Sequence, residues 1–368
     1  MDNLNIVITG GGTGGHLFPA IAIGEEIRNQ MPNANIHYIG SIYGLESKVF
    51  PVKDLVHTLL PIKGLQRSLS IKGLLKNLIL PFRIISSIIK VRSLYRDFKP
   101  GLIIGTGGYA SAIPLFVASK SNPEIPIILQ EQNSYPGLTT RLFAKKAKKI
   151  CVAFDYDNIN LKQKIEITGN PIRNNIISGN KNKAYNDLQF NKNKKTLFIF
   201  GGSQGSSFLN KSIESIIKNL NNSNTQILWQ TGANDFLKYK QYNSETIKVV
   251  SFIDDMANAY SIADLIVCRS GAITLSEITI CGKPSILIPF AAAAENHQLN
   301  NAKTLLKAGA SSVIEEKDLT SNILYKNIIS LLNNKVNLKN MSAAAKKLSK
   351  PNAAINIAKI SLNFGPNV

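Results

Sequence analysis

The chain has 368 residues, which is long for one domain and sufficient for two, and 44% of them are hydrophobic. No run approaches the roughly 18 uncharged apolar residues of a spanning helix, so we expect no integral membrane protein. The formal net charge of +20 favours a polyanionic partner, either nucleic acid or an anionic membrane surface. A general bias towards lysine and asparagine is the alternative explanation.

The beginning of the chain predicts a strand that ends in a glycine-rich turn. Residues 5–9 (NIVIT) lead into residues 10–16 (GGGTGGH), and a helix is expected over about 19–29. The turn matches the G-x-G-x-x-G pattern of dinucleotide-binding folds. That pattern also needs an acidic residue at the end of the second strand, where it holds the ribose of NAD. The second strand, 35–39, ends in Gly40 and Ser41, which disfavours NAD.

The segment 70–96 predicts a basic, amphipathic helix that is interrupted by Pro81. Its apolar positions exceed one buried stripe, and basic residues flank both ends, as in a helix that touches a membrane surface. A helix that packs on the sheet is the alternative. For membrane contact, the candidate residues are Leu74, Leu75, Ile79 and Phe82.

Two further glycine turns follow predicted strands. Residues 102–104 lead into 105–109 (GTGGY), and residues 197–200 lead into 201–206 (GGSQGS). Ligands of open parallel sheets bind at the carboxyl ends of the strands, so turns that let the backbone come close predict a ligand site. A tight turn without a ligand is the alternative for any one of them.

The middle of the chain contains a pair of carboxylates and a polar tract. Asp155 and Asp157 match the D-x-D pattern of metal-dependent sugar transferases, but a lone pair of this kind caps helices more often. The three cysteines form no metal-spaced pair, so we expect no metal. The tract 174–195 is rich in Asn and Lys and predicts a domain boundary nearby. Alternating strands and helices resume after it, which predicts two doubly wound α/β units.

The stretch 264–298 indicates a nucleotide site. The strand 263–268 (ADLIVC) passes through a short turn (RSG) into a helix that begins near Ala272. The first turn of a helix offers backbone N–H groups and the positive end of the macrodipole, and small residues let a phosphate approach. Glu277, about one turn further, only accepts hydrogen bonds and suits the hydroxyls of a ribose. An ordinary β-α-β unit with a satisfied helix cap is the alternative.

Six motifs together strongly resemble the MurG family, the UDP-N-acetylglucosamine:N-acetylmuramyl-(pentapeptide) pyrophosphoryl-undecaprenol N-acetylglucosaminyltransferases of bacterial peptidoglycan synthesis. The motifs are GGTGGH at 11–16, TGGY at 106–109, EQN at 131–133, GNPIR at 169–173, GGSQG at 201–205 and RSGA at 269–272. The resemblance covers almost the whole chain and implies a GT-B fold of two Rossmann-like, doubly wound α/β domains separated by a cleft. The implied domains are residues 1–169, completed by a C-terminal helix at 352–368, and residues 170–351.

The resemblance also implies where the substrates bind. The backbone of Ile253 would meet uracil, Glu277 would hold the ribose, and Ser203 would take the pyrophosphate. The donor positions implied for UDP-GlcNAc are Thr13, Gly14, Gly15, Asn133, Arg173, Ser203, Ile253, Ala272, Ile273, Thr274, Leu275, Ser276, Glu277 and Gln298. The acceptor, undecaprenyl-pyrophosphoryl-MurNAc-pentapeptide, would bind near the glycine turns of the first domain, at Gly107, Gly108 and Tyr109.

The implied reaction is a single inverting displacement, in which the acceptor hydroxyl attacks the anomeric carbon and UDP departs. It needs positive groups for the leaving phosphate, supplied by helix N-termini and Arg173, and a base for the hydroxyl proton. His16 is the candidate base, because the ordinary histidine pKa of about 6.5 suits proton removal near neutral pH. Glu131 and a bound water are the alternatives. The family uses no cofactor of its own.

The family implies a peripheral protein on the cytoplasmic side of the bacterial inner membrane. The first residues show no secretory signal, which agrees with that expectation. A non-catalytic nucleotide-sugar-binding protein and another GT-B glycosyltransferase are the alternatives. A nucleic-acid binder is disfavoured, because Trp229 and scattered tyrosines do not place exposed aromatic side chains among basic ones.

Overall fold

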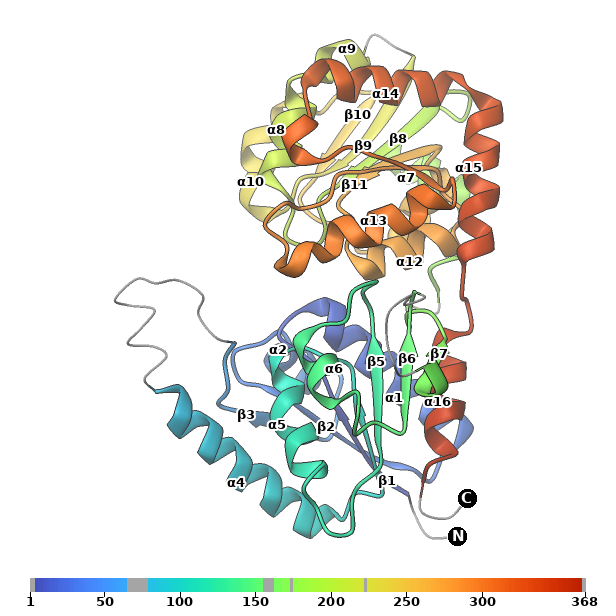
Figure 1. Cartoon of the computed structure of the whole chain (residues 1–368). Coiled ribbons are helices and arrows are strands. Elements are labelled where there is room, and N and C mark those ends of the chain that lie inside the picture. The colour runs from blue at the N-terminus through green and yellow to red at the C-terminus, as the bar shows by residue number, and fades with distance from the viewer. Residues whose placement is uncertain (1–3, 65–78, 155–161, 173–174, 222–223, 366–368) are drawn as a thin grey trace. The chain divides into compact units, whose positions relative to one another are not determined.

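A computed structural model describes the chain except for residues 1–3, 65–78, 155–161, 173–174, 222–223 and 366–368. The chain divides into two compact units (Figure 1). The first is formed by residues 1–172 together with 352–368, and the second by residues 173–351. Each unit contains one parallel sheet with helices on both of its faces.

The first unit has a sheet in the order β3-β2-β1-β4-β5-β6-β7, and neighbouring strands run parallel. The strands are β1 Asn5–Thr9, β2 Asn35–Ser41, β3 His57–Leu60, β4 Leu102–Gly105, β5 Ile127–Glu131, β6 Lys149–Val152 and β7 Ile165–Ile167. The helices are α1 Gly14–Gln30, α2 Glu46–Val52, α4 Leu80–Phe98, α5 Tyr109–Ala118, α6 Leu138–Phe143, the short η1 Lys162–Lys164 and α16 Ala353–Leu362.

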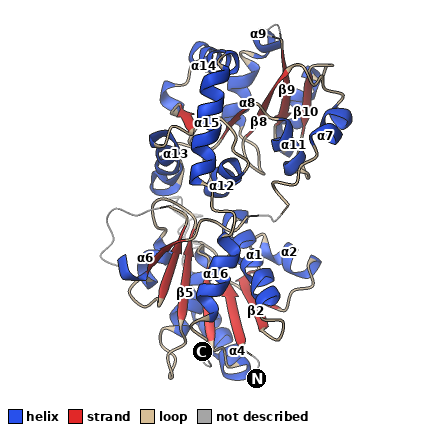
Figure 2. Cartoon of the chain, turned by 90° about the vertical axis from the view of Figure 1, so that its right-hand side faces the viewer, coloured by secondary structure: helices blue, strands red, loops and turns tan. Residues whose placement is uncertain are grey.

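Alternating side chains of β1 build two cores in the first unit. Val7 packs on the face covered by α4, α5 and α6, whereas Ile6 and Ile8 pack on the face covered by α1, α2 and α16. All three side chains are fully buried, as expected for a central strand of a parallel sheet. Figure 2 shows α16 beside α1, and Gln30 Nε2 donates a hydrogen bond to Ile355 O at 3.1 Å. The C-terminal helix is therefore part of the first unit.

The second unit has a sheet in the order β10-β9-β8-β11-β12-β13, again with parallel neighbours. The strands are β8 Lys195–Phe200, β9 Thr225–Gln230, β10 Ile247–Val250, β11 Leu265–Cys268, β12 Ser285–Leu287 and β13 Ser311–Val313. The helices are α7 Lys181–Leu188, α8 Ser207–Glu214, α9 Ile217–Asn221, α10 Ala233–Tyr239, α11 Met256–Ile262, α12 Ala272–Ile280, α13 His297–Lys307, α14 Ser321–Asn333 and α15 Lys335–Leu348, with the short η2 Lys240–Tyr242, η3 Ala294–Asn296 and η4 Glu316–Asp318.

Aromatic side chains fill both faces of the second sheet. Trp229 is fully buried in the core beneath α8, α9, α10, α14 and α15, and its Nε1 donates to Asn210 Oδ1 at 3.1 Å. The rings of Phe198 and Phe200 stack with centroids 4.6 Å apart, and Tyr260 of α11 meets both rings edge-on.

Pro19 and Pro81 stand at different positions within their helices. The predicted helix begins near Pro19, but α1 already starts at Gly14, and Pro19 lies inside it at the cost of one hydrogen bond. Pro81 stands in the first turn of α4, and most of the predicted helical segment before it lies outside the described residues. The N–H that proline lacks has no intrahelical partner at that position in any helix, so Pro81 starts the helix without penalty.

Both sheets reverse their strand order beside the first strand of the unit. β1 lies between β2 and β4 in the first sheet, and β8 lies between β9 and β11 in the second. Connections that follow the two central strands leave on opposite faces, which opens a crevice at the carboxyl ends of these strands. The three glycine-rich loops follow β1, β4 and β8, and the turn RSG follows β11.

A substitution in α16 tests its place in the core of the first unit. Ile357 is fully buried there, and Ile357→Ala should destabilise that unit by about 2–5 kcal/mol through lost burial and a residual cavity. The single tryptophan of the chain lies in the core of the second unit. We therefore expect thermal unfolding to move to lower temperature in far-ultraviolet circular dichroism, while tryptophan fluorescence keeps its transition.

Ile355→Ala is the matched control, because Ile355 lies on the same helix and is 46% exposed. That variant should leave both signals unchanged. A fluorescence transition that shifts as far as the circular dichroism transition in Ile357→Ala would contradict the assignment of α16 to the first core alone.

Candidate functional site

The carboxyl end of β11 leads directly into a helix N-terminus suited to an anion. α12 begins at Ala272 after Gly271, whose own side chain cannot cap the helix, and its first turn contains no acidic residue. Ile273, Thr274 and Ser276 are half-buried and reach the surface of the helix. The partial positive charge of this turn favours a phosphate. Within the predicted donor set, Ala272 to Ser276 therefore surround one helix terminus.

Leu275 differs from the other residues of that turn. Its side chain is fully buried, and its N–H donates to Gly271 O at 3.0 Å. Neither group can contact a ligand at the surface, so Leu275 supports the turn from inside the core. The helical period explains this difference between neighbouring residues, because consecutive residues of one turn face both the core and the solvent.

Arg269, which precedes this turn, is a buried cation that joins three strand ends. It is 7% exposed, and its Nη1 donates to Ile288 O at 3.1 Å and to Pro289 O at 3.2 Å. Nη1 also lies 2.6 Å from Glu316 Oε1, an ion pair whose angle does not satisfy a hydrogen bond. Its Nε donates to Ser206 Oγ at 3.1 Å. The RSGA motif contains Arg269, but the sequence predicted no role for this side chain.

Gln230 links the glycine loop after β8 to the loop after β10. Its Nε2 donates to Gly202 O at 3.0 Å, and its Oε1 accepts from Ile253 N at 2.9 Å. Ser203, in the same glycine loop, is exposed, as a phosphate contact requires. Since the N–H of Ile253 is occupied by Gln230, the carbonyl oxygen is the Ile253 backbone group left for a uracil N–H.

Glu277 is a buried carboxylate on α12. It is 6% exposed, and its Oε2 accepts from the hydroxyl of Tyr260 at 2.9 Å. Burial, followed by the nearby carboxylate, raises the pKa of Tyr260 well above its ordinary value, so the tyrosine stays a proton donor. This hydrogen bond fixes the carboxylate in one orientation, as a group that grips a ribose diol requires.

Gln298 holds the loop that follows β12. Its side-chain Oε1 accepts from Phe290 N at 3.1 Å, and its backbone carbonyl accepts from Ser270 Oγ at 2.8 Å. Through these two bonds the loop after β12 is tied to the turn before α12. The predicted donor residues Ser203, Ile253, Glu277 and Gln298 thus stand on loops or helices at the carboxyl edge of one sheet.

The glycine turn of the first unit is organised around an internal carboxylate. Glu46 is fully buried; its two oxygens accept from Gly12 N at 3.2 and 3.0 Å, and Oε1 also accepts from Ser41 N at 2.8 Å. A Cβ built on Gly11 would lie 2.3 Å from Oε1. Glu46 is thus an internal anion for this turn. Thr13, Gly14 and Gly15 follow it, as the last extended residue and the first two residues of α1.

The second glycine turn lies directly against the first. Gly107 and Gly108 have φ values of +90° and +78°, and a Cβ on Gly108 would approach Gly11 O to 2.1 Å. Only glycine fits this close approach. Tyr109, the first residue of α5, is half-buried, and its ring lies beside the position that a Cβ on Gly12 would occupy. The three predicted acceptor residues therefore border the first turn.

His16, on the first turn of α1, faces the loop after β4. Its Nδ1 lies 3.0 Å from Thr106 O and 2.9 Å from Gln132 Oε1. Thr106 Oγ1 in turn donates to His16 O at 2.8 Å. The imidazole is half-buried, so it is held by protein contacts on one side and has an accessible part.

Glu131 uses its carboxylate to shape its own loop. Oε1 accepts from Asn133 N at 3.0 Å and from Asn133 Nδ2 at 3.2 Å, and Oε2 accepts from Gly137 N at 2.9 Å and Thr140 Oγ1 at 2.6 Å. The side chain is 3% exposed. With four donors on two buried oxygens, Glu131 is built to position Asn133 and the start of α6, which is a different task from proton abstraction.

α4 packs on the first unit with one face and exposes apolar side chains on the other. Val91 and Tyr95 are buried in the core. Ile79 before the helix and Phe82 within it are 51% and 75% exposed, and Ile85 and Ile89 are 57% and 64% exposed. Within the described ranges, no helix combines the length and apolar character needed to cross a membrane.

Five residues discussed from the sequence lie outside the described ranges. These are Leu74 and Leu75 of the predicted membrane segment, Asp155 and Asp157 of the D-x-D pattern, and the donor residue Arg173. In the described part of the chain, no group of three His, Cys, Asp or Glu side chains is arranged to hold a metal ion.

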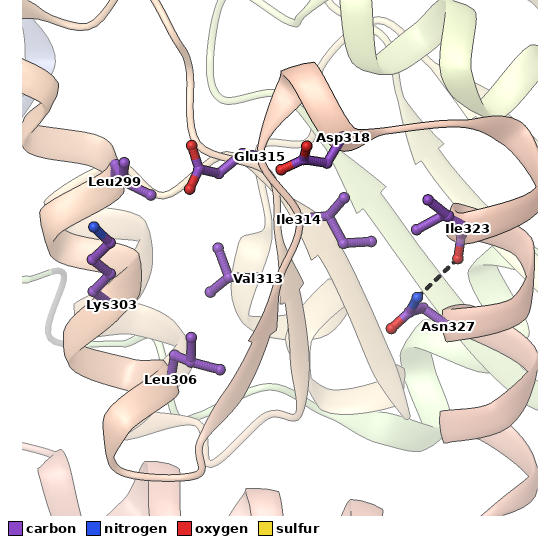
Figure 3. Close-up of a pocket in the computed structure, with 9 residues that line it drawn as sticks. All are labelled: Leu299, Lys303, Leu306, Val313, Ile314, Glu315, Asp318, Ile323 and Asn327. Carbon is purple, nitrogen blue, oxygen red and sulfur yellow. Dashed lines mark hydrogen bonds between the residues drawn. The ribbon is translucent and has the colours of Figure 1, made fainter.

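A separate pocket lies between α13, β13 and α14 of the second unit (Figure 3). Its volume is 330 Å³, and it contains none of the predicted site residues. Figure 3 shows the side chains of Glu315 and Asp318 at one end, and Asn327 Nδ2 already donates to Ile323 O at 2.9 Å. The lining residues are Leu299, Lys303, Leu306, Val313, Ile314, Glu315, Asp318, Ile323 and Asn327.

Comparison with protein families matches both units. The N-terminal domain of glycosyltransferase family 28 matches residues 6–152, and the C-terminal domain of the same family matches residues 196–357. The UDP-N-acetylglucosamine–N-acetylmuramyl-(pentapeptide) pyrophosphoryl-undecaprenol N-acetylglucosamine transferase of Flavobacterium psychrophilum is 40% identical over 97% of this chain and 96% of its own. The protein of the same name from Finegoldia magna is 39% identical over 96% of both chains.

Solved structures show the same two-domain fold. MurG of Acinetobacter baumannii superposes with a TM-score of 0.77 at 24% identity and covers 98% of this chain and 99% of its own. The glycosyltransferase VinC, solved with dTDP, gives a TM-score of 0.66 at 11% identity over 98% of this chain and 99% of its own. The predicted GT-B class of two Rossmann-like α/β domains is confirmed.

Proposed function

The chain belongs to the MurG family of UDP-N-acetylglucosamine–N-acetylmuramyl-(pentapeptide) pyrophosphoryl-undecaprenol N-acetylglucosamine transferases, and on this premise we propose how its residues divide the reaction. It transfers GlcNAc from UDP-GlcNAc to the muramyl sugar of an undecaprenyl-pyrophosphate-linked intermediate in peptidoglycan synthesis. The observation that carries this conclusion is 40% identity along nearly the full length of a relative. The anion-binding turn beside the buried Glu277 supports it independently.

The second unit binds the nucleotide of the donor. The N-terminus of α12 takes the pyrophosphate together with Ser203, and Glu277 accepts hydrogen bonds from the ribose. The Ile253 carbonyl contacts uracil, and Gln298 contacts the sugar. Support comes from the position of all these groups at one sheet edge and from the absence of an acidic residue in the first turn of α12.

The first unit binds the acceptor and supplies the base. Gly107, Gly108 and Tyr109 border the lipid-linked pyrophosphate, while Thr13, Gly14, Gly15 and Asn133 approach the donor. His16 removes the proton of the attacking hydroxyl as the oxygen bonds to the anomeric carbon, and the bond to UDP breaks with its electron pair. The N-terminus of α12 and Arg173 stabilise the charge that develops on UDP. Glu131 positions Asn133.

Transfer of labelled GlcNAc from UDP-GlcNAc to a lipid-linked muramyl acceptor tests the proposed activity. We expect a labelled, lipid-extractable disaccharide product and release of UDP. UDP binding without any transfer would instead favour the non-catalytic nucleotide-sugar-binding alternative. Transfer to a different acceptor would favour another GT-B glycosyltransferase.

Glu277→Ala should weaken donor binding. If the carboxylate accepts charge-assisted hydrogen bonds from ribose, its loss costs about 1.5–3 kcal/mol, or roughly ten- to 150-fold in the UDP dissociation constant. Isothermal titration calorimetry with UDP measures this effect. Because Glu277 also holds the Tyr260 hydroxyl, Tyr260→Phe is the control for losing that bond alone. Unchanged UDP affinity in folded Glu277→Ala would remove Glu277 from the site.

His16→Ala should reduce turnover while leaving UDP binding nearly intact. Loss of a general base lowers kcat by about 10²–10⁴, because the proton no longer has a positioned acceptor. Steady-state kinetics at saturating acceptor, measured across pH, test this prediction. A role in positioning alone has a different signature: the acceptor KM would rise, kcat would largely recover, and the acidic limb of the pH–rate profile would persist in the variant.

We further propose that the protein works at the cytoplasmic face of the bacterial inner membrane and docks there through the segment that ends in α4. The exposed stripe of Ile79, Phe82, Ile85 and Ile89 supports this proposal. Basic side chains accompany it, because Arg83 lies over the ring of the exposed Tyr43 at 5.1 Å and Lys90 is exposed. Leu74 and Leu75 extend the docking segment by sequence. Such a surface gains from both apolar burial and attraction to anionic lipid.

Phe82→Ser with Ile89→Ser should weaken binding to vesicles of anionic phospholipid. Each apolar side chain that leaves water contributes up to about 1.5–3 kcal/mol, so we expect a loss of at least tenfold in the vesicle partition constant, together with weaker binding in salt. Cosedimentation measures both effects. Leu237→Ser is the matched control, because Leu237 is 72% exposed on the second unit. If neither salt nor the double substitution changes the vesicle partition constant, a different surface of the protein contacts the membrane.

A further inference from the structure

Three buried amide side chains of the first unit form a chain of hydrogen bonds that ends on His16. Asn170 Oδ1 accepts from Gln130 Nε2 at 3.0 Å, and Gln130 Oε1 accepts from Gln132 Nε2. Gln132 Oε1 then lies 2.9 Å from His16 Nδ1. The three amide residues are at most 2% exposed. They come from β5, the loop after it and the loop after β7.

Backbone carbonyls fix the orientation of the amide groups at both ends of this series of hydrogen bonds. Asn170 Nδ2 donates to Gln132 O at 3.1 Å, and Gln132 Nε2 donates to Thr106 O at 2.6 Å. A backbone carbonyl only accepts, so both amides have a single orientation that satisfies their neighbours. Gln132 must therefore present its oxygen to His16. Thr106 O, the second neighbour of His16 Nδ1, is also an acceptor.

We propose that Asn170, Gln130 and Gln132 are positioning residues that keep the proton of neutral His16 on Nδ1 and leave Nε2 as the proton acceptor. The proposal rests on the assignment of His16 as the base. With two oxygens facing Nδ1, the other tautomer would set a ring lone pair against two carbonyl oxygens. It would also place a proton on Nε2, which would then be unable to accept one from the hydroxyl.

The same hydrogen bonds continue to act after proton transfer. The O–H bond of the acceptor breaks, a proton joins Nε2, and the imidazolium then donates through Nδ1–H to Thr106 O and Gln132 Oε1. These bonds strengthen when the donor becomes charged. Rotation of the Gln132 amide would reverse this benefit, because its NH₂ group would face Nδ1–H and its oxygen would face two other oxygens. Gln130 and Asn170 oppose that rotation.

The tautomer of His16 is directly measurable. The chain has four histidines, so protein labelled with ¹⁵N-histidine gives few ring signals, and the His16→Gln spectrum identifies those of His16. Two-bond ¹⁵N–¹H correlation at about pH 9, well above the ordinary histidine pKa of about 6.5, distinguishes the protonated ring nitrogen from the unprotonated one. We expect Nδ1–H in the wild-type protein. Finding Nε2–H there would overturn the proposal without any variant.

Two substitutions of Gln132 distinguish the effect of its side-chain oxygen as a hydrogen-bond acceptor from the effect of its packing. Gln132→Glu keeps an oxygen towards His16 and should keep the Nδ1–H tautomer, at a cost in stability because its second oxygen replaces the NH₂ group that donates to Thr106 O and Gln130 Oε1. Gln132→Met, of similar size, removes one of the two oxygens that face Nδ1 and leaves Thr106 O as the other. It should therefore increase the fraction of His16 that carries its proton on Nε2 and lower kcat in the same proportion, with UDP affinity unchanged. An unchanged tautomer in folded Gln132→Met would overturn the proposal. Gln226→Met is the matched control, because Gln226 is a 1%-exposed amide on β9 of the second unit.

The experiments distinguish failure of the base assignment from failure of the positioning proposal. If His16→Ala retains wild-type kcat while the spectra behave as expected, the amide chain holds the tautomer and the base assignment is wrong. If His16→Ala loses turnover but Gln132→Met keeps both tautomer and kcat, His16 is the base and the amide chain does not position it.

Discussion

The reversal of strand order beside the first strand of each sheet determines where the candidate residues stand. In the first sheet the connections after β1 and β4 leave on opposite faces, and in the second sheet those after β8 and β11 do the same. Within each sheet, two loops and two helix N-termini therefore meet at the carboxyl edge. That meeting requires close backbone approach, which explains why a Cβ on Gly108 would lie 2.1 Å from Gly11 O. Helix ends supply positive potential at the same edge. The crevice thus follows from topology before any side chain is considered.

The two units use this common geometry in opposite ways. In the first unit a buried carboxylate, Glu46, already accepts from the N–H of Gly12. In the second unit the first turn of α12 has no acidic side chain, and the nearby buried cation Arg269 is directed to backbone carbonyls and Glu316. An internal anion makes the first turn a fixed structural element, whereas the second turn retains its attraction for a phosphate. This difference agrees with nucleotide binding by the second unit.

Local patterns were sufficient to predict the fold class and the loops that carry the site. Strand, glycine turn and helix follow one another within short stretches, and the proposed anion site at α12 depends on neighbouring residues alone. Contacts between distant residues were not predictable in the same way. Glu46 meets Gly12 across 34 positions and His16 meets Gln132 across 116. The sequence leaves Glu131 as an alternative base, because only the folded structure shows its bonds to Gly137 and Thr140.

The polar residues at the end of β5 show what the sequence can still indicate about such long-range contacts. Gln130 and Gln132 alternate with Glu131 at the end of an apolar strand, and uncharged amides at fully buried positions need partners on their own face of the sheet. An amide also differs from a carboxylate as a partner for histidine. A carboxylate stabilises the imidazolium and raises a histidine pKa, whereas an amide oxygen selects the tautomer without adding charge. Near a pyrophosphate-bearing acceptor, an uncharged partner avoids a further negative group beside the substrate. The proposed hydrogen-bonded amides thus orient a proton acceptor without adding a charge of their own.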